Sequence, residues 1–124
     1  MRELLLWVFT DKFFENTEMV QIAVDTLMTG PYPQPAHGLI RQVDACLEHN
    51  TKDRIGNINA PTLVLTGQED ILVPVRMLEE LAAGIAGAEL VVLEGAGHGV
   101  YYEAADKFNL AILDFLSKVE SQAS

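Results

Sequence analysis

Two residues of complementary chemistry, Asp70 and His98, each follow a short apolar run bounded by Pro and Gly. The runs cover residues 63–65 and 89–93, and an apolar-periodic segment separates them, which predicts a strand–helix–strand unit. Strands joined in this way are parallel with a right-handed crossover, so both side chains are expected at the carboxyl edge of one sheet. Open α/β sheets place their chemistry at that edge, and an Asp beside a His is an acid that orients a base. We therefore expect Asp70 and His98 to lie within hydrogen-bonding reach.

The nucleophile that such a pair would activate is missing from the stretch before it. No serine precedes Asp70, and the three serines, Ser117, Ser121 and Ser124, all lie near the C-terminal end. Cys46 falls on the apolar stripe of an expected helix and has no flanking glycines, so a buried, inert thiol is expected. Simpler roles stay open for the pair, because an Asp after a strand often caps the next helix and a Gly-flanked His is often a turn residue.

The remaining elements are expected to be helices that pack around the strand pair. Hydrophobic spacing and start and stop signals predict helices over residues 2–14, 18–29, 36–48, 74–85 and 103–118. Asn16 or Thr17 can cap the second of them, and residues 120–124 are expected to fray. His37 and His49 lie near the ends of the third, where surface or capping roles are favoured over ligation or acid–base chemistry. The third also carries an apolar stripe that is expected to face inward, formed by Leu39, Ile40, Val43, Cys46 and Leu47.

Length and composition limit the class of protein. A chain of 124 residues makes one domain at most, residues 1–124. Apolar residues make up 49% of it, and no run approaches the roughly 18 residues of a membrane span. The net charge of −10 argues against nucleic acid and anionic membranes as partners. The single cysteine excludes an internal disulfide and fits a cytoplasmic location, and we expect no cofactor and no metal.

The motifs around Asp70 and His98 resemble those of the α/β-hydrolase superfamily. Residues 61–74, Pro-Thr-Leu-Val-Leu-Thr-Gly-Gln-Glu-Asp-Ile-Leu-Val-Pro, are similar to the strand and turn that carry the triad acid there. Residues 95–99, Gly-Ala-Gly-His-Gly, followed by Glu103, are similar to the loop that carries the triad histidine. Residues 34–42, with Gln-Pro and His-Gly-Leu-Ile-Arg-Gln, resemble the enol-lactonase and haloperoxidase-like branch. The resemblance covers nearly the whole chain but only the C-terminal half of a complete enzyme.

The resemblance implies that Asp70 is the triad acid and His98 the general base. In the family the nucleophile comes first, in a Gly-x-Ser-x-Gly turn, so that motif and the oxyanion-hole loops would lie before Met1. The fold that the resemblance implies is α/β, a partial α/β-hydrolase built on a parallel strand pair with flanking helices. Cap-type helices are expected over 1–50, and a strand–helix–strand–helix unit over 60–119.

Three functions follow as hypotheses. In the first, the chain is a catalytically silent hydrolase remnant that persists as an oligomer, most simply a homodimer, because two strands alone are rarely stable and open edges bind other chains. The alternative is half of a split carboxylic-ester or lactone hydrolase, active only with an N-terminal half from another chain or a longer gene product. In the third, His98, oriented by Asp70, activates water directly on a small labile substrate. Neither nucleic acid nor a membrane is expected as a partner.

Overall fold

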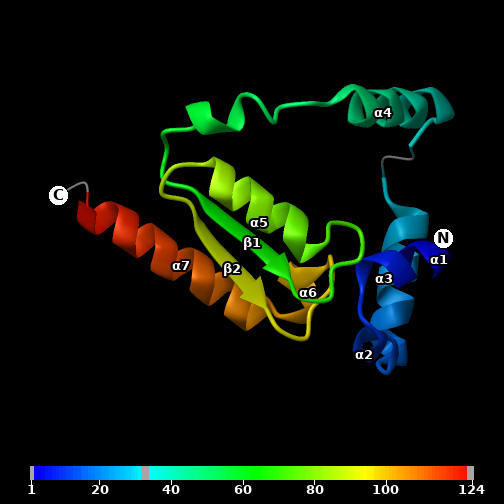
Figure 1. Ribbon diagram of the computed structural model, residues 1–124. Helices are drawn as coiled ribbons and strands as arrows, with labels where there is room; N and C mark the ends of the chain where they lie inside the picture. Colours follow the sequence, from blue (N-terminus) through cyan, green and yellow to red (C-terminus); the bar gives the residue numbers. More distant parts are fainter. Residues whose placement is uncertain (1, 32–33, 123–124) are drawn as a thin grey trace.

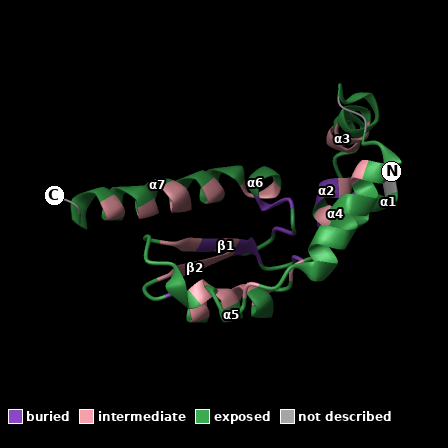
Figure 2. Ribbon diagram, turned by 90° about the horizontal axis from the view of Figure 1, so that it is seen from above, coloured by how far each residue is buried: buried purple, intermediate pink, exposed green. Residues whose placement is uncertain are grey.

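The centre of the fold is a two-stranded parallel sheet. The computed structural model describes residues 2–31 and 34–122. Strand β1 (Leu63–Gly67) pairs with β2 (Glu89–Leu93), with Leu63 opposite Glu89 and Gly67 opposite Leu93. Helix α5 (Val75–Gly84) connects the strands and covers one face, and α7 (Ala105–Gln122) covers the other (Figure 1, Figure 2). The predicted α/β fold with its parallel strand pair is therefore confirmed.

The best-buried part of this unit lies where β2 ends. Leu93, Ala96 and Val100 form a buried cluster, and partly buried residues of the strands, of α7 and of the junction before α7 pack against it, namely Leu65, Val91, Phe108 and Ala104. Both strands are apolar along most of their length, which is typical of strands covered on both faces. Most of the strand residues are nevertheless only half-buried, because in the described part of the chain the sheet is no wider than these two strands.

The N-terminal helices lie beside the carboxyl ends of the strands (Figure 1). They are α1 (Arg2–Val8), α2 (Asp11–Phe14) and α3 (Thr17–Thr29). The Asn16 side chain caps α3 by accepting from the Met19 N–H at 3.1 Å, as predicted. The single helix predicted over 2–14 is wrong. Helix α1 ends at Val8 because the N–H of Thr10 donates to the carboxylate of Glu103 instead of to a carbonyl of the helix. The hydroxyl of Thr10 donates to the same carboxylate.

Helix α4 (Ala36–Glu48) lies on an arm apart from the sheet, and Figure 2 shows it almost wholly in the colour of exposed residues. Its bounds agree with the prediction, but the expected burial of its apolar stripe is wrong. Leu39, Ile40, Val43 and Leu47 are between 48% and 80% exposed, and Cys46, expected to be a buried thiol, is exposed as well. Hydrophobic periodicity predicts a helix with one apolar face, but it does not say which element packs on that face.

The C-terminal region contains two helices where one was predicted. Helix α6 (Val100–Glu103) has Ala104 as its C-cap residue, and α7 then begins at Ala105 and continues to Gln122. The expected fraying of residues 120–122 is therefore wrong, and residues 123–124 lie outside the described residues. The separate turn of α6 returns Glu103 to the loop after β2, where its carboxylate accepts a hydrogen bond from Gly97 N–H. No helix in the described ranges is long and apolar enough to cross a membrane.

Candidate active site

The two loops at the carboxyl edge of the sheet are held together by backbone contacts. Glu69 N–H donates to the carbonyl of Ala96 at 2.9 Å, which ties the loop after β1 to the loop after β2. Gly67, the last residue of β1, approaches the second loop so closely that a Cβ there would overlap the carbonyl oxygens of Ala96 and Gly97. Only glycine permits this approach. The acid and the base that follow the two strands are therefore placed side by side by the backbone itself.

Asp70 is held in one orientation by backbone amides. Its Oδ1 accepts from the N–H groups of Leu72 and Val73, at 2.9 and 2.8 Å. The side chain is only 6% exposed. Helix α5 begins at Val75, so these amides belong to the turn before the helix, and Asp70 is not its N-cap. The other carboxylate oxygen remains available for a second partner.

His98 is that partner. Its Nδ1 lies 3.0 Å from Oδ2 of Asp70, so the predicted pairing is confirmed. A carboxylate only accepts hydrogen bonds, so Nδ1 must carry a proton, and Nε2 of the neutral imidazole is then the basic nitrogen. Within the described residues Nε2 makes no hydrogen bond, and the side chain is 43% exposed. The pair therefore presents an oriented, accessible base.

An apolar pocket opens beside His98. Its volume is about 410 Å³, and its walls come from α1, α3 and α6, with Leu5, Val8, Phe9, Ile22, Leu27 and Tyr101 among the lining residues. None of the lining residues that the structure describes is a Lys or an Arg. This site can present the basic nitrogen of His98 to an uncharged, apolar group.

The serine and cysteine candidates that the structure describes lie on helices away from this pair. Ser117 and Ser121 are on the last part of α7, which runs from the carboxyl edge of the sheet toward the opposite end (Figure 1, Figure 2). Cys46 is on α4, and Ser124 lies outside the described residues. Among the described residues, the structure therefore brings none of these serine or cysteine candidates to His98.

The other two histidines have the positions that their sequence context favoured. His37 is exposed in the first turn of α4, and His49 is the C-cap residue of that helix, with its Nε2 3.3 Å from the hydroxyl of Thr51. Across the described ranges, no three His, Cys, Asp or Glu side chains gather in a way that could hold a metal ion. Among the described histidines, His98 is the one paired with a carboxylate.

Known proteins share this architecture. The structure matches the enol-lactonase from Burkholderia xenovorans LB400 with a TM-score of 0.80 and 27% identity, over 93% of this chain and 43% of that one. It matches a thermophilic esterase from Thermogutta terrifontis with a TM-score of 0.80 and 25% identity, over 94% of this chain and 42% of that one. A 2-hydroxy-6-oxononadienedioate/2-hydroxy-6-oxononatrienedioate hydrolase of Klebsiella pneumoniae is 45% identical over 65 residues, 52% of this chain and 23% of the relative. Fold and motifs thus define the class as α/β-hydrolase, and the resemblance inferred from the sequence is confirmed.

The family can be stated more closely. Residues 32–124 match the TAP-like protein family, and because this match covers most of the chain, the chain belongs to that family. The chain spans less than half the length of the enol-lactonase and esterase structures that it matches. Its 124 residues contain no Gly-x-Ser-x-Gly motif. The region that this chain shares with these structures therefore carries the Asp70–His98 pair but no nucleophile motif.

Three features of the site were not predicted. They are the amides that hold Asp70, the apolar pocket, and the hydrogen bonds of Glu103. Asp side chains in turns often accept a hydrogen bond from the backbone two residues further on, so the contact of Asp70 with the Leu72 amide could have been inferred from the sequence. Glu103 was visible as part of the histidine motif but had no role assigned. The pocket depends on how α1 and α3 dock, and no local pattern encodes that.

Proposed function

We propose that this chain supplies the acid and the base of a hydrolase triad and is catalytically silent by itself. The observation that carries the proposal is the pair itself, with Asp70 Oδ2 on His98 Nδ1 at 3.0 Å and Oδ1 held by two amides. In such a pair the carboxylate keeps the imidazole in one tautomer and stabilises the imidazolium that forms. Nε2 of His98 would accept the proton of a nucleophile hydroxyl as it attacks a carbonyl carbon, and would then return it to the leaving group.

We expect no catalysis by residues 1–124 alone because they lack two parts of the catalytic machinery. The nucleophile motif is absent, and no described serine or cysteine candidate lies near His98. Oxyanion stabilisation is usually the largest catalytic term, and loss of one donor costs about 10²–10³ in rate. Direct activation of water by His98 would have to proceed without a nucleophile elbow or its amide. We therefore expect ester turnover by the chain alone to equal that of a His98→Ala control.

A second proposal is that the chain is one half of a carboxylic-ester or lactone hydrolase whose N-terminal half comes from another chain or from a longer polypeptide. A fully formed acid–base pair beside an apolar pocket supports this proposal. Two of the solved structures that share its fold are an enol-lactonase and an esterase. Since the described lining has no Lys or Arg, the pocket favours an uncharged acyl group over a dianionic one.

We also propose that the chain self-associates, most simply as a homodimer. The apolar stripe of α4 is exposed, and β1 has only one partner among the described strands. Exposed apolar stripes and open strand edges are surfaces that soluble proteins cover. A two-fold arrangement would bury both at once in each copy.

A chimeric protein tests the first two proposals together. The part of the Burkholderia xenovorans enol-lactonase that precedes the region matching this chain is fused to residues 1–124. Hydrolysis of p-nitrophenyl butyrate is then measured for the chimera, for the chain alone and for the His98→Ala version of each. Circular dichroism establishes that each protein is folded.

We expect turnover by the chimera and a loss of at least about 10³ in kcat on His98→Ala, because triad members act as a unit. The chain alone should show no His98-dependent rate. A folded chimera without His98-dependent turnover would contradict the half-enzyme proposal. His98-dependent turnover by residues 1–124 alone would contradict catalytic silence.

A further inference from the structure

The backbone is fixed on both sides of His98. The N–H of Gly97 donates to Oε2 of Glu103 at 2.7 Å, and the N–H of Gly99 donates to the carbonyl oxygen of Val8 at 2.7 Å. Gly97 and Gly99 are both buried, so water is a poor substitute for these partners. The position of the imidazole therefore depends on two groups that lie outside its own loop.

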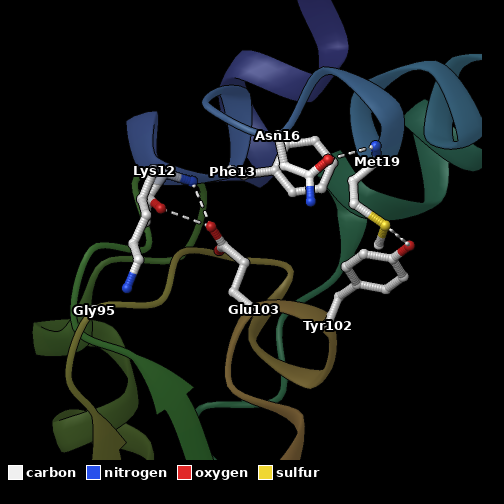
Figure 3. A pocket seen from close by; sticks show the side chains of 8 residues that line it. Lys12, Phe13, Asn16, Met19, Gly95, Tyr102 and Glu103 are labelled. Carbon is white, nitrogen blue, oxygen red and sulfur yellow. Dashed lines mark hydrogen bonds between the residues drawn. The ribbon is translucent and has the colours of Figure 1, made fainter.

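Glu103 also holds a distant part of the chain. While Oε2 takes the Gly97 amide, Oε1 accepts from the N–H of Thr10 at 2.9 Å and from its hydroxyl at 2.6 Å. Figure 3 shows Glu103 reaching from α6 to the beginning of α2, beside the loop that contains Gly95. Three donors converge on one half-buried carboxylate, and bonds to a charged acceptor are the strong ones. Glu103 thus joins the loop that contains His98 (residues 94–99, the histidine loop) to Thr10, which lies 93 positions before Glu103 in the sequence.

The same two segments are also in direct contact. A Cβ on Gly99 would overlap the ring of Phe9, and a Cβ on Gly97 would lie 3.1 Å from the carbonyl oxygen of Val8. Phe9 in turn stacks on Phe13, with ring centroids 4.0 Å apart. The loop therefore cannot shift by much without moving residues 8–10.

We infer that Glu103 is a positioning residue for His98. It fixes the histidine loop, through the Gly97 amide, to the segment of residues 8–10, through Thr10. Val8 and Phe9 of that segment also line the apolar pocket. The wall of the pocket and the base are therefore joined by one carboxylate. The role of His98 as base rests on the function proposed above, whereas the fixing of its loop does not and can be measured without turnover.

A purely structural role would give a different result. If Glu103 only anchored the start of α2, its loss would lower stability but leave the Asp70–His98 hydrogen bond unchanged. The test therefore needs a signal from the imidazole as well as from the backbone. It uses ¹⁵N-labelled chain and compares Glu103→Ala, Glu103→Gln and Glu94→Gln with the unchanged sequence. Glu94 is exposed at the start of the same loop and controls for loss of a negative charge.

Three quantities are measured in the same samples. They are amide hydrogen exchange at Gly97, the ¹⁵N and proton signals of the His98 ring, and the urea midpoint of unfolding. In Glu103→Ala we expect exchange at Gly97 to accelerate at least about tenfold relative to the amides of β2, as loss of a charged acceptor predicts. The Nδ1 proton signal of His98 should broaden or disappear. Glu103→Gln can still accept from Gly97 through its single carbonyl oxygen, so it should restore most of both signals, while Glu94→Gln should change neither.

The inference is overturned if a folded Glu103→Ala protein keeps the His98 ring signals, whatever happens to stability. If Glu103→Ala does not fold, Glu103→Gln and Thr10→Val decide the question. Thr10→Val removes the hydroxyl, one of the two donors to Oε1, and should accelerate exchange at Gly97 and broaden the His98 Nδ1 signal relative to the unchanged sequence and to Glu103→Gln. Unchanged Gly97 exchange and unchanged His98 ring signals in Thr10→Val would also overturn it. None of these readings depends on whether the chimera is active.

Discussion

Replacement of Asp70 tests the geometry of the acid most directly. Asp70→Ala removes three acceptor contacts, those with the amides of Leu72 and Val73 and that with Nδ1 of His98. Asp70→Asn has the same size and retains an oxygen for the two amides. Its NH₂ group, however, then faces His98 and cannot accept. The two substitutions therefore separate the backbone contacts of the acid from its contact with the base.

The expected magnitudes follow from the contacts. Hydrogen bonds to a charged group contribute about 1.5–3 kcal/mol each, and a buried donor left without a partner costs about 1–3 kcal/mol. The Asp70 side chain is 6% exposed, but Leu72 is 43% exposed, so water replaces part of the loss. We expect Asp70→Ala to lower the free energy of unfolding by about 2–4 kcal/mol and Asp70→Asn by about 1 kcal/mol. His98→Ala should cost less, about 1 kcal/mol, because that side chain is 43% exposed and water replaces part of its one hydrogen bond to Asp70.

Urea unfolding followed by circular dichroism measures these differences. It should be repeated at several protein concentrations, because self-association would add to apparent stability. The ¹⁵N signals of His98 supply the second reading. In Asp70→Asn, Nδ1 must accept, so the ring proton moves to Nε2, and kcat of the chimera should fall by about 10⁴.

Equal losses for Asp70→Ala and Asp70→Asn would show that the amides of Leu72 and Val73 do not depend on this side chain. A loss below about 1 kcal/mol for Asp70→Ala would lead to the same conclusion. An unchanged His98 tautomer in Asp70→Asn would show that Nδ1 does not face the acid. Any of these results would refute the inferred role of Asp70 as the residue that orders both its own turn and the imidazole.

Two further predictions concern the sheet and its surroundings. Gly67→Ala should lower the free energy of unfolding by at least about 3 kcal/mol in urea titrations, because the added methyl group overlaps backbone carbonyl oxygens. Gly56→Ala is the control and should change it little, because a Cβ there would lie 3.7 Å from its nearest neighbour. Equal effects would contradict the close approach of the two loops. In sedimentation equilibrium at micromolar concentration we expect a dimer that Leu47→Glu converts to monomer and Ala45→Glu, on the opposite face of α4, does not. A wild-type monomer with cooperative unfolding would contradict self-association.

The elements that local chemistry encodes were predicted well. The strand Glu89–Leu93 and the helix Ala36–Glu48 have the bounds expected from apolar runs and breakers, and Asn16 caps its helix as expected. The Asp70–His98 contact was predictable as well, since it requires only that two consecutive parallel strands end at the same edge. Sequence periodicity and topology together were sufficient for the chemistry of the pair.

The errors arise where a distant residue decides the local structure. Within residues 2–14 the signal for the break is a single threonine, a residue type favoured at N-caps, and the carboxylate that holds Thr10 lies 93 positions further along the chain. The apolar stripe of α4 correctly predicted a helix, but burial depends on a partner surface that periodicity cannot identify. The predicted burial of Cys46 is wrong for the same reason. For α4 and Cys46 the local pattern predicted the helix correctly, but the surroundings that determine burial are not contained in that pattern.

The separation between Thr10 and Glu103 has a consequence for the order of folding. Asp70 and His98 are 28 positions apart, whereas Thr10 and Glu103 are 93 apart. Closing the longer loop costs about 1 kcal/mol more in chain entropy, by the logarithmic dependence on loop length. Contacts of small sequence separation form faster, so we expect the strand pair to bring the acid and base together first. Helices α1 and α2 would dock last, and the loop that positions the His98 imidazole would be fully fixed only at that late step.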